Sequence, residues 1–223
     1  MLAESPDMER ISTIRPLVVD LGCGNIGSVV RMLTLIGASP EVINTPPRSA
    51  VDVPVVLPGV GNFTHAARSL SGTWRAWLDQ LHGSNTPILG ICLGAQLMCR
   101  SSEEGGGEGL GWVDSRVRRF PELDAHGNSL RIPHMGWESF SPPRGCLPFE
   151  VPSGRMYYAH SYFMTPPVNA AHAPYRFEYG GLRFAAVIRS RYAIGVQFHP
   201  EKSHHHGKQF LSAWMTWARE GAG

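Results

Sequence analysis

The residue of this chain best suited to nucleophilic chemistry is Cys92, which stands between Gly90 and Gly94 in the run PILGICLGAQLM, residues 87–98. Gly-x-Cys-x-Gly between a strand and a helix has the form of a nucleophile elbow, with cysteine in place of serine. The tight turn requires the glycines and places the sulfur at a helix N-terminus, which favours a thiolate. The run also fits a buried cysteine at a strand end, so this motif alone leaves both interpretations open.

A nucleophilic cysteine needs a base, and the base needs a group that orients it. His199 ends the apolar run AIGVQF, and Pro200 and Glu201 follow it. A turn at Pro200 can let the carboxylate reach the second ring nitrogen, which sets the tautomer that faces the thiol. The alternative is an ordinary turn with exposed polar residues.

Attack on a carbonyl produces an oxyanion, which needs two N–H donors. One donor is the amide after the nucleophile, on Leu93. The segment PGVGNF, residues 58–63, follows a strand, and Gly59 and Gly61 allow its backbone to approach closely. Val60 or Gly61 would supply the second donor, unless this segment is a plain glycine turn.

The elements around these motifs alternate between strand and helix. Continuous apolar runs predict buried strands, and apolar residues at helical spacing predict the helices between them. Such alternation indicates a parallel sheet whose functional loops lie at the carboxyl ends of the strands. The predicted strands span 16–22, 53–63 with its Gly/Pro turn, and 87–91; the predicted helices span 25–38, 63–83, one beginning at 95–102, and an amphipathic one at 203–220.

From about residue 113, short strands and turns replace this alternation. The predicted fold class is therefore α/β, with a mostly parallel central sheet, helices on both faces, and a C-terminal region of mixed or antiparallel strands. Residues 1–15 are polar and are predicted to form a flexible extension before a single domain at 16–223. The glycine-rich segment 102–109 is predicted to be a flexible surface loop.

Composition limits the classes of protein to which this chain can belong. Of 223 residues, 43% are hydrophobic and 17% charged, which is typical of a globular chain. The net charge of +2 gives no indication of a nucleic-acid or membrane partner. There is no secretory signal and no apolar run near the roughly 20 residues of a membrane span, so the cytoplasm is expected. The spacing of the four cysteines matches no zinc motif or disulfide framework, which favours free thiols.

Five segments occur in order: LPGVGNF, GICLGAQLM, IPHMGWE, YYAHSYF and GVQFHPEKS. Together they resemble the triad class of glutamine amidotransferases, and within it the glutaminase subunits of imidazole glycerol phosphate synthase. The resemblance covers about residues 16–218. It implies hydrolysis of L-glutamine to glutamate and ammonia through a thioester on Cys92, with His199 as the base and Glu201 as its orienting acid. The resemblance implies no cofactor.

The same resemblance implies the residues that bind glutamine. Gln96 lies one helical turn after Cys92, so both side chains can face one pocket. Glu104 matches an acidic residue that receives the α-ammonium group of the substrate. The residues that the resemblance places at the substrate are Gly59, Gln96, Glu104, His160, Ser161 and Tyr162. An exposed helical position for Gln96 and ordinary core packing for Tyr162 are the alternatives.

In such enzymes the ammonia passes through a channel to a partner (βα)8-barrel cyclase, which implies a heterodimer. The cyclase forms imidazole glycerol phosphate and an aminoimidazole carboxamide ribotide in histidine biosynthesis. The residues implied at the interface are Asn25, Pro133, Met135, Trp137 and Lys202. Trp137 could also be an ordinary core tryptophan. The tract His204–His206 is expected to be a solvated helix start, not a metal site, because no further ligands complete a set.

Three other functions fit parts of the sequence. Glu138 stands where the resembling proteins usually have asparagine after the tryptophan, and the tail also differs. Paralogous glutaminases feed ammonia into amidino-sugar synthesis for surface polysaccharide with their own barrel partner. An elbow hydrolase acting on esters would need neither Gln96 nor the HSY segment. A non-catalytic regulatory subunit would have no reason to keep Cys92, His199 and Glu201.

Overall fold

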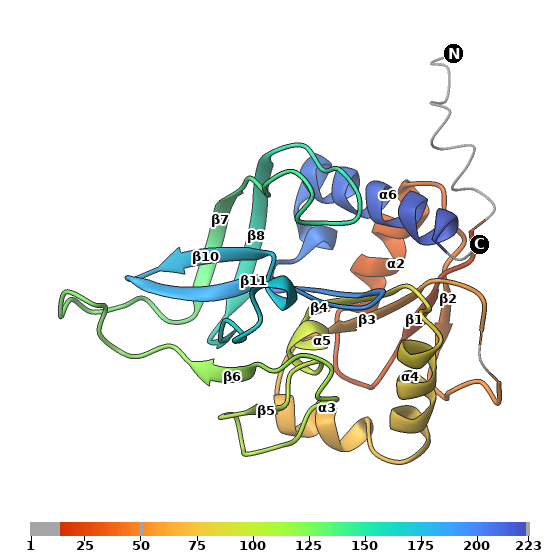
Figure 1. Ribbon diagram of the computed structural model, residues 1–223, viewed down its shortest axis with the longest axis horizontal. Helices are drawn as coiled ribbons and strands as arrows, with labels where there is room; N and C mark the ends of the chain where they lie inside the picture. The colour runs from red at the N-terminus through yellow and green to blue at the C-terminus, as the bar shows by residue number, and fades with distance from the viewer. Residues whose placement is uncertain (1–13, 50, 222–223) are drawn as a thin grey trace.

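A seven-stranded sheet forms the centre of the computed structural model, which describes residues 14–49 and 51–221 (Figure 1). The strand order is β10-β11-β12-β4-β3-β1-β2. Neighbours from β12 to β2 are parallel, and β11 and β10 extend the sheet in antiparallel pairing. The bounds are β1 Leu17–Val19, β2 Glu41–Ile43, β3 Val55–Gly59, β4 Ile88–Cys92, β10 Tyr175–Tyr179, β11 Leu182–Ser190 and β12 Ala193–Val196.

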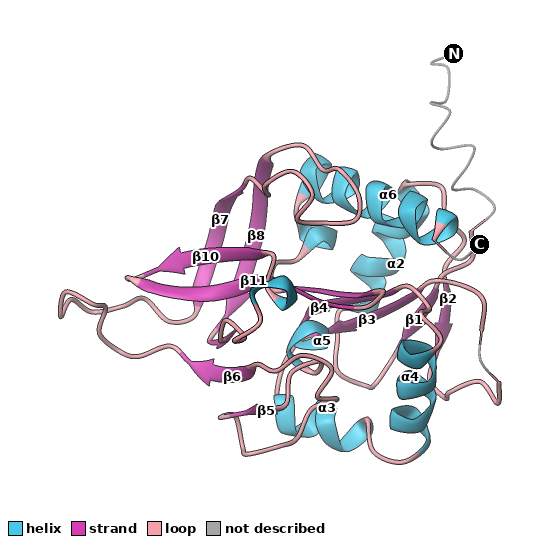
Figure 2. Ribbon diagram, in the orientation of Figure 1, coloured by secondary structure: helices cyan, strands magenta, loops and turns pink. Residues whose placement is uncertain are grey.

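Helices cover both faces of this sheet, as predicted (Figure 2). Strands β3 and β4 are buried along their whole length, which explains their continuous apolar sequences. Helices α2 (Ile26–Leu35) and α6 (His204–Glu220) bury their apolar stripes in one core cluster. Helices α3 (Phe63–Ser69), α4 (Thr73–Gly83) and α5 (Leu93–Gln96) belong to the other. The predicted α/β class is confirmed.

Two small sheets stand beside the carboxyl ends of the central strands. Strand β7 (His134–Phe140) pairs with β8 (Gly154–His160) in antiparallel register from His134 opposite His160 to Phe140 opposite Gly154. Strands β5 (Ser101–Ser102), β6 (Arg116–Arg119) and β9 (Tyr162–Met164) form the other sheet. Two short 3-10 helices, η1 (Ala170–His172) and η2 (Pro200–Lys202), complete the elements of the described residues.

Two helix predictions are wrong in their extent. The helix predicted over 63–83 is divided into α3 and α4, because Gly72 has a φ of 70°, outside the helical region. The helix predicted to begin at 95–102 ends after one turn at Gln96. Its next carbonyl groups accept from a later segment instead: Leu97 from the amide of Leu110, and Cys99 from that of Gly111.

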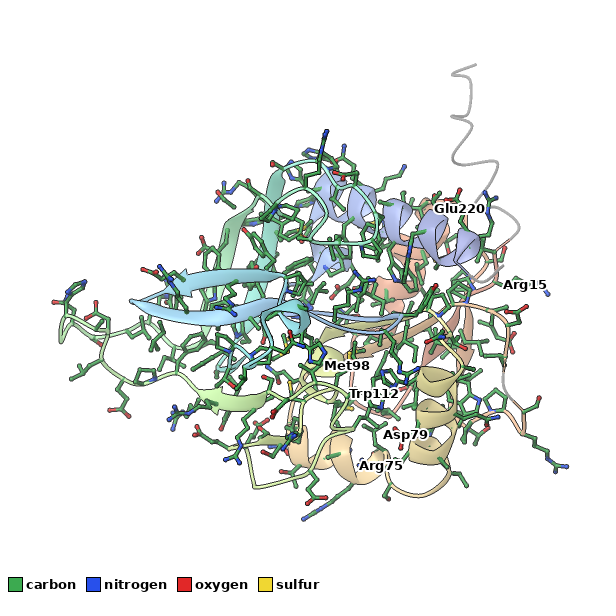
Figure 3. All side chains as sticks on the ribbon, in the orientation of Figure 1. Arg15, Arg75, Asp79, Met98, Trp112 and Glu220 are labelled. Carbon is green, nitrogen blue, oxygen red and sulfur yellow. The ribbon has the colours of Figure 1, made fainter. Side chains whose placement is uncertain are left out.

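This later segment is held against helix α4 by side chains (Figure 3). The Trp112 indole donates to Asp79 over 2.8 Å, and the Arg75 guanidinium donates to the carbonyl groups of Gly109 and Leu110. The loop before it, predicted to be flexible, is bonded to α3: the Thr64 hydroxyl donates to the carbonyl of Glu104 over 2.6 Å. The loop therefore has a defined place beside α3.

The predicted N-terminal extension lies mostly outside the described residues. Of its last two residues, Ile14 is buried in a core cluster, and its carbonyl accepts from the amide of Ser39. Within the described ranges, no helix is long and apolar enough to cross a membrane.

The close approach of α5 to β3 at Gly94 generates a stability prediction. A Cβ added to Gly94 would overlap the carbonyl oxygen of Leu57, so Gly94→Ala forces α5 away from β3. We expect a loss of roughly 2–4 kcal/mol in the free energy of unfolding, measured by urea denaturation. Gly83→Ala is the matched control, because nothing lies within 4 Å of its added Cβ. Equal stability of the two variants would contradict this packing.

Candidate active site

Cys92 occupies the turn between β4 and α5, in a backbone conformation that side chains rarely adopt. Its φ is 51° and its ψ −104°, a strained conformation that costs about 1–3 kcal/mol and persists only when the surroundings enforce it. A Cβ on Gly90 would collide with the backbone of Ala95 and Gly94, and one on Gly94 with the Leu57 carbonyl. Only glycine therefore fits on either side of the turn. Cys92 also pairs in register with Gly59 at the end of β3. The segment after β3 therefore leaves the sheet next to the sulfur.

His199 and Glu201 follow β12, the parallel neighbour of β4 on its other side. His199 Nδ1 lies 2.8 Å from Glu201 Oε1, and both side chains are buried. The ring is also fixed through its backbone, whose amide donates to the carbonyl of Tyr157 and whose carbonyl accepts from Ser203 Oγ. Because Glu201 holds Nδ1, the other ring nitrogen is left free for Cys92, whose attraction raises the pKa of His199.

The charge state of His199 follows from these contacts. Burial acts to lower the pKa of His199, but attraction to Cys92, the hydrogen bond to Cys92 and the contacts with Glu201 outweigh it and raise the pKa from 6.5 to about 10. The imidazole is therefore protonated at neutral pH. A positively charged ring beside the sulfur is the arrangement that activates a cysteine nucleophile.

Gln197 is a site residue that the sequence reasoning missed. Its side chain is fully buried, and its Nε2 lies 3.6 Å from Cys92 Sγ. Its Oε1 accepts from Gln96 Nε2 over 3.2 Å, and Gln96 Nε2 also donates to the Tyr162 carbonyl over 2.9 Å. Gln197 therefore links the sulfur to Gln96. Its position two residues before His199, on the same side of an extended chain, was the signal that could have identified it.

A cavity of about 330 Å³ opens over Cys92. It collects residues from segments far apart in the sequence, including most of those predicted to act on the substrate. The predicted site residues that line it are Val60, Gly61, Cys92, Leu93, Gln96, Glu104, Pro133, Met135, His160, Ser161 and Tyr162. Gly59, His199 and Glu201 lie outside this lining: Gly59 is packed against Leu93, and the two others are buried.

The sequence of residues 17–216 matches the family model of class-I glutamine amidotransferases. The chain belongs to the class-I glutamine amidotransferase family. It is 37% identical over 209 residues to the imidazole glycerol phosphate synthase subunit HisH of Synechococcus sp. strain CC9902, covering 92% of this chain and 95% of that protein. It is 37% identical over 206 residues to subunit HisH 2 of Pseudomonas aeruginosa, covering 89% and 98%.

A solved glutamine amidotransferase structure has the same fold. It superposes with a TM-score of 0.64 over 91% of this chain and 98% of the other, at 13% identity. The predicted family is therefore confirmed by sequence, and the fold is supported independently. The protein is an enzyme of the glutamine amidotransferase class.

In this glutamine amidotransferase the residues of the predicted oxyanion donors line the same cavity as Cys92. Leu93 is the first residue of α5, so its amide belongs to the helix N-terminus, where backbone N–H groups lack helical partners. Gly61 has a φ of 106°, which favours glycine, and Val60, which is 37% exposed, lines the cavity with it. The amide of Val60 or that of Gly61 stays the predicted second donor.

Glu104 combines a structural contact with its place at the cavity. Its Oε2 accepts from the Phe63 amide over 2.7 Å, at the first residue of α3. This contact anchors the carboxylate at a helix N-terminus and keeps it in the cavity wall. Glu104 is the carboxylate among the cavity-lining residues.

The residues predicted at a partner interface divide into two groups. Met135 is 52% exposed at the cavity, with Pro133 beside it. Trp137 lies between Tyr157 and His204, and its ring stacks on that of His204 at 5.1 Å between centroids. The remaining two lie elsewhere: Asn25 caps α2 by accepting from the amide of Ser28, and Lys202 lies in η2.

The other cysteines lack the features of Cys92. Cys99 is fully buried, and burial raises the pKa of its thiol to about 12, which makes it unreactive. All four cysteines are free thiols. Within residues 14–49 and 51–221, no group of three or more His, Cys, Asp or Glu could hold a metal ion.

The charge state of His199 can be measured directly. We expect its imidazole to titrate near pH 10 in NMR, and Cys92→Ala to lower this pKa because it removes the largest raising influence. Glu201→Gln should lower the pKa as well. Cys99→Ala is the control and should leave the titration unchanged. A wild-type pKa below 6.5 would contradict the Cys92–His199 arrangement.

The role of Gln197 is tested by Gln197→Met, which keeps its length but removes both hydrogen bonds. Because Cys92 and Gln96 each lose a buried partner, we expect kcat/KM for glutamate release to fall by about one order of magnitude. Gln209→Met, at an exposed position of α6, is the matched control. Equal kinetics of the two variants would show that Gln197 only fills space.

Proposed function

We propose that this protein is the glutaminase subunit of an imidazole glycerol phosphate synthase. It hydrolyses L-glutamine and passes the ammonia to a barrel cyclase partner in histidine biosynthesis. The observation that carries the proposal is the placement of Cys92 in the wall of a cavity lined by Gln96 and Glu104, with the buried His199–Glu201 pair following the strand next to that of Cys92. Family membership and the HisH relatives support the same activity.

The first half-reaction forms the thioester. The sulfur of Cys92 attacks the carboxamide carbon of glutamine, and the C–N π-conjugation is lost as negative charge collects on oxygen. The amides of Leu93 and of Val60 or Gly61 donate to this oxyanion. The His199 imidazolium gives its proton to the amide nitrogen, the C–N bond breaks, and ammonia leaves.

The second half-reaction releases glutamate. His199 is now neutral and takes a proton from a water molecule, which attacks the thioester carbon through a second oxyanion. The C–S bond breaks, the sulfur recovers its electron pair, and glutamate leaves with His199 protonated again. Glu201 accepts the hydrogen of Nδ1 throughout, so the ring keeps one orientation.

Substrate recognition uses both ends of glutamine. Glu104 is the carboxylate in the cavity wall and suits the α-ammonium group. Gln96, held by Gln197 and the Tyr162 carbonyl, together with Ser161 and His160, faces the same space. The cavity volume of about 330 Å³ suits a ligand of the size of an amino acid.

The cyclase docks on the surface where the cavity opens. Met135 and Pro133 form part of the cavity rim, and Trp137 lies on the same strand. Exposed methionine and aromatic side chains are the types enriched at protein interfaces. A partner seated there closes the cavity mouth, so ammonia released at Cys92 enters the partner and not the solvent.

The proposal predicts glutamate release from glutamine when the chain is combined with a histidine-pathway barrel cyclase. Cys92→Ala should abolish it by at least about a thousandfold, because no nucleophile remains. Cys99→Ala is the matched control and should retain activity, because its thiol takes no part.

Two results would contradict the proposal in different ways. No glutamate release by the wild-type complex would contradict the glutaminase activity itself. Activation by a barrel partner from amidino-sugar synthesis, and none by the histidine-pathway cyclase, would assign the enzyme to the paralogous route.

A further inference from the structure

A row of polar contacts runs from the middle of β7 to the wall of the cavity. Glu138 Oε1 lies 3.2 Å from His134 Nε2, and His134 Nδ1 lies 3.1 Å from His160 Nε2. His160 Nδ1 lies 2.7 Å from the carbonyl oxygen of Tyr162, which also accepts from Gln96. The row joins a carboxylate whose side chain is 34% exposed to residues that line the cavity.

The number of hydrogens in this row decides how many of its three contacts are hydrogen bonds. Each of the three contacts needs one hydrogen, and the Tyr162 carbonyl and an ionised Glu138 can only accept. Two neutral imidazoles carry two hydrogens between them. A third hydrogen, on a charged ring or on the carboxyl group, is needed before all three contacts are hydrogen bonds. Without it, Glu138 and Tyr162 compete for the two ring hydrogens.

The surroundings keep both rings neutral at neutral pH, so the third proton is absent there. Burial lowers the pKa of His160 to about 3, and it lowers the pKa of His134, which Glu138 partly opposes. Tyr158 of β8 and Tyr179 of β10 face the His134 ring, and burial raises the pKa of both hydroxyls, so they stay neutral. Further groups act on these neighbours: His199 on His160, Glu138 on both tyrosines, Tyr175 on Tyr158, and Arg131 on Tyr179.

Charge decides the competition when the third proton is absent. A hydrogen bond to a carboxylate is roughly twice as strong as one to a neutral carbonyl. Both rings therefore direct their hydrogens toward Glu138, and His160 Nδ1 is left without one. The Tyr162 carbonyl then keeps Gln96 as its donor and loses His160, so this part of the cavity wall is held less firmly.

We propose that Glu138 is a positioning residue for the glutamine site, because it competes with the Tyr162 carbonyl for the ring hydrogens of His134 and His160. The identity of the ligand rests on the proposed function, but the count of hydrogens does not. At acidic pH, below the ordinary histidine pKa of 6.5, the third proton completes the row and holds Tyr162 and Gln96 in place. At alkaline pH the row is incomplete, and glutamine binds more weakly.

Two substitutions distinguish the effect of the Glu138 charge from the effect of its side-chain size. In Glu138→Gln an amide hydrogen replaces the third proton, so the row is complete with neutral rings at every pH. In Glu138→Leu the row has no acceptor or donor at this end, and His134 is left with an unpartnered nitrogen. Glu41→Gln, at an exposed position of β2, is the matched control.

Glutamine affinity is measured by calorimetry in the full-length Cys92→Ala protein, which binds without turnover. We expect Glu138→Gln to bind glutamine about fivefold more tightly than its parent at alkaline pH, and equally at acidic pH where the third proton is bound. Glu41→Gln should follow the parent at both. Equal affinities of Glu138→Gln and parent at alkaline pH would overturn the inference, whereas no glutamine binding at all would contradict the proposed function.

The ring tautomers give a readout that needs no ligand. In ¹⁵N-histidine-labelled protein, His160 Nδ1 should carry its hydrogen at acidic pH, where the third proton is bound, and lose it at alkaline pH. In Glu138→Gln it should keep the hydrogen at both, while Glu138→Leu removes the competing carboxylate and should also keep it. The same His160 tautomer in the wild type at both pH values would overturn the inference, whatever the enzyme binds.

Discussion

The site depends on the close approach of helix α5 to strand β3. There is no room for a side chain between Gly94 and the Leu57 carbonyl, so the helix begins almost on the sheet. The chain can enter such a helix only through a sharp turn, which gives Cys92 its positive φ and places the sulfur in the cavity wall. The same turn puts the Leu93 amide at the helix start, next to that sulfur. The proposed nucleophile and the proposed oxyanion donor therefore arise from one backbone constraint.

A second constraint is the satisfaction of buried polar groups around this turn. Gln197 and His199 lie in the core with almost no exposure, where an unpartnered polar group costs about 1–3 kcal/mol. Their partners are Cys92, Gln96 and Glu201, so the folded core and the proposed catalytic arrangement require the same contacts. Because β12 is the parallel neighbour of β4, the two halves of the site meet at one sheet edge.

Much of the fold could be predicted because it depends on local pattern. Strands β3 and β4 are buried on both faces and have continuous apolar sequences, and α6 buries the predicted stripe of Phe210, Leu211, Trp214 and Met215. The break at Gly72 and the end of α5 at Gln96 were missed. The second depends on amides from residues 110 and 111, which no local pattern around Gln96 shows.

The site residues likewise divide into those that a local sequence pattern indicates and those that depend on contacts distant in the chain. The turn at Cys92 and the His199–Glu201 pair have short spacings with a chemical meaning, so the sequence indicated them. Gln197 was missed because its role depends on a neighbour 105 positions away in the chain. The Glu138–His134 contact was missed because two residues four apart on a strand do not ordinarily touch, and this pair does.

The central claim is that Cys92 is the nucleophile that carries the glutamyl group. Rapid acid quenching of the enzyme during glutamine turnover, followed by peptide mass spectrometry, tests it most directly. We expect a gain of one glutamyl acyl group on the peptide that contains Cys92, removed by hydroxylamine and absent without glutamine. Turnover of glutamine with no acyl group on Cys92, or with one on Cys23, Cys99 or Cys146 instead, would contradict it.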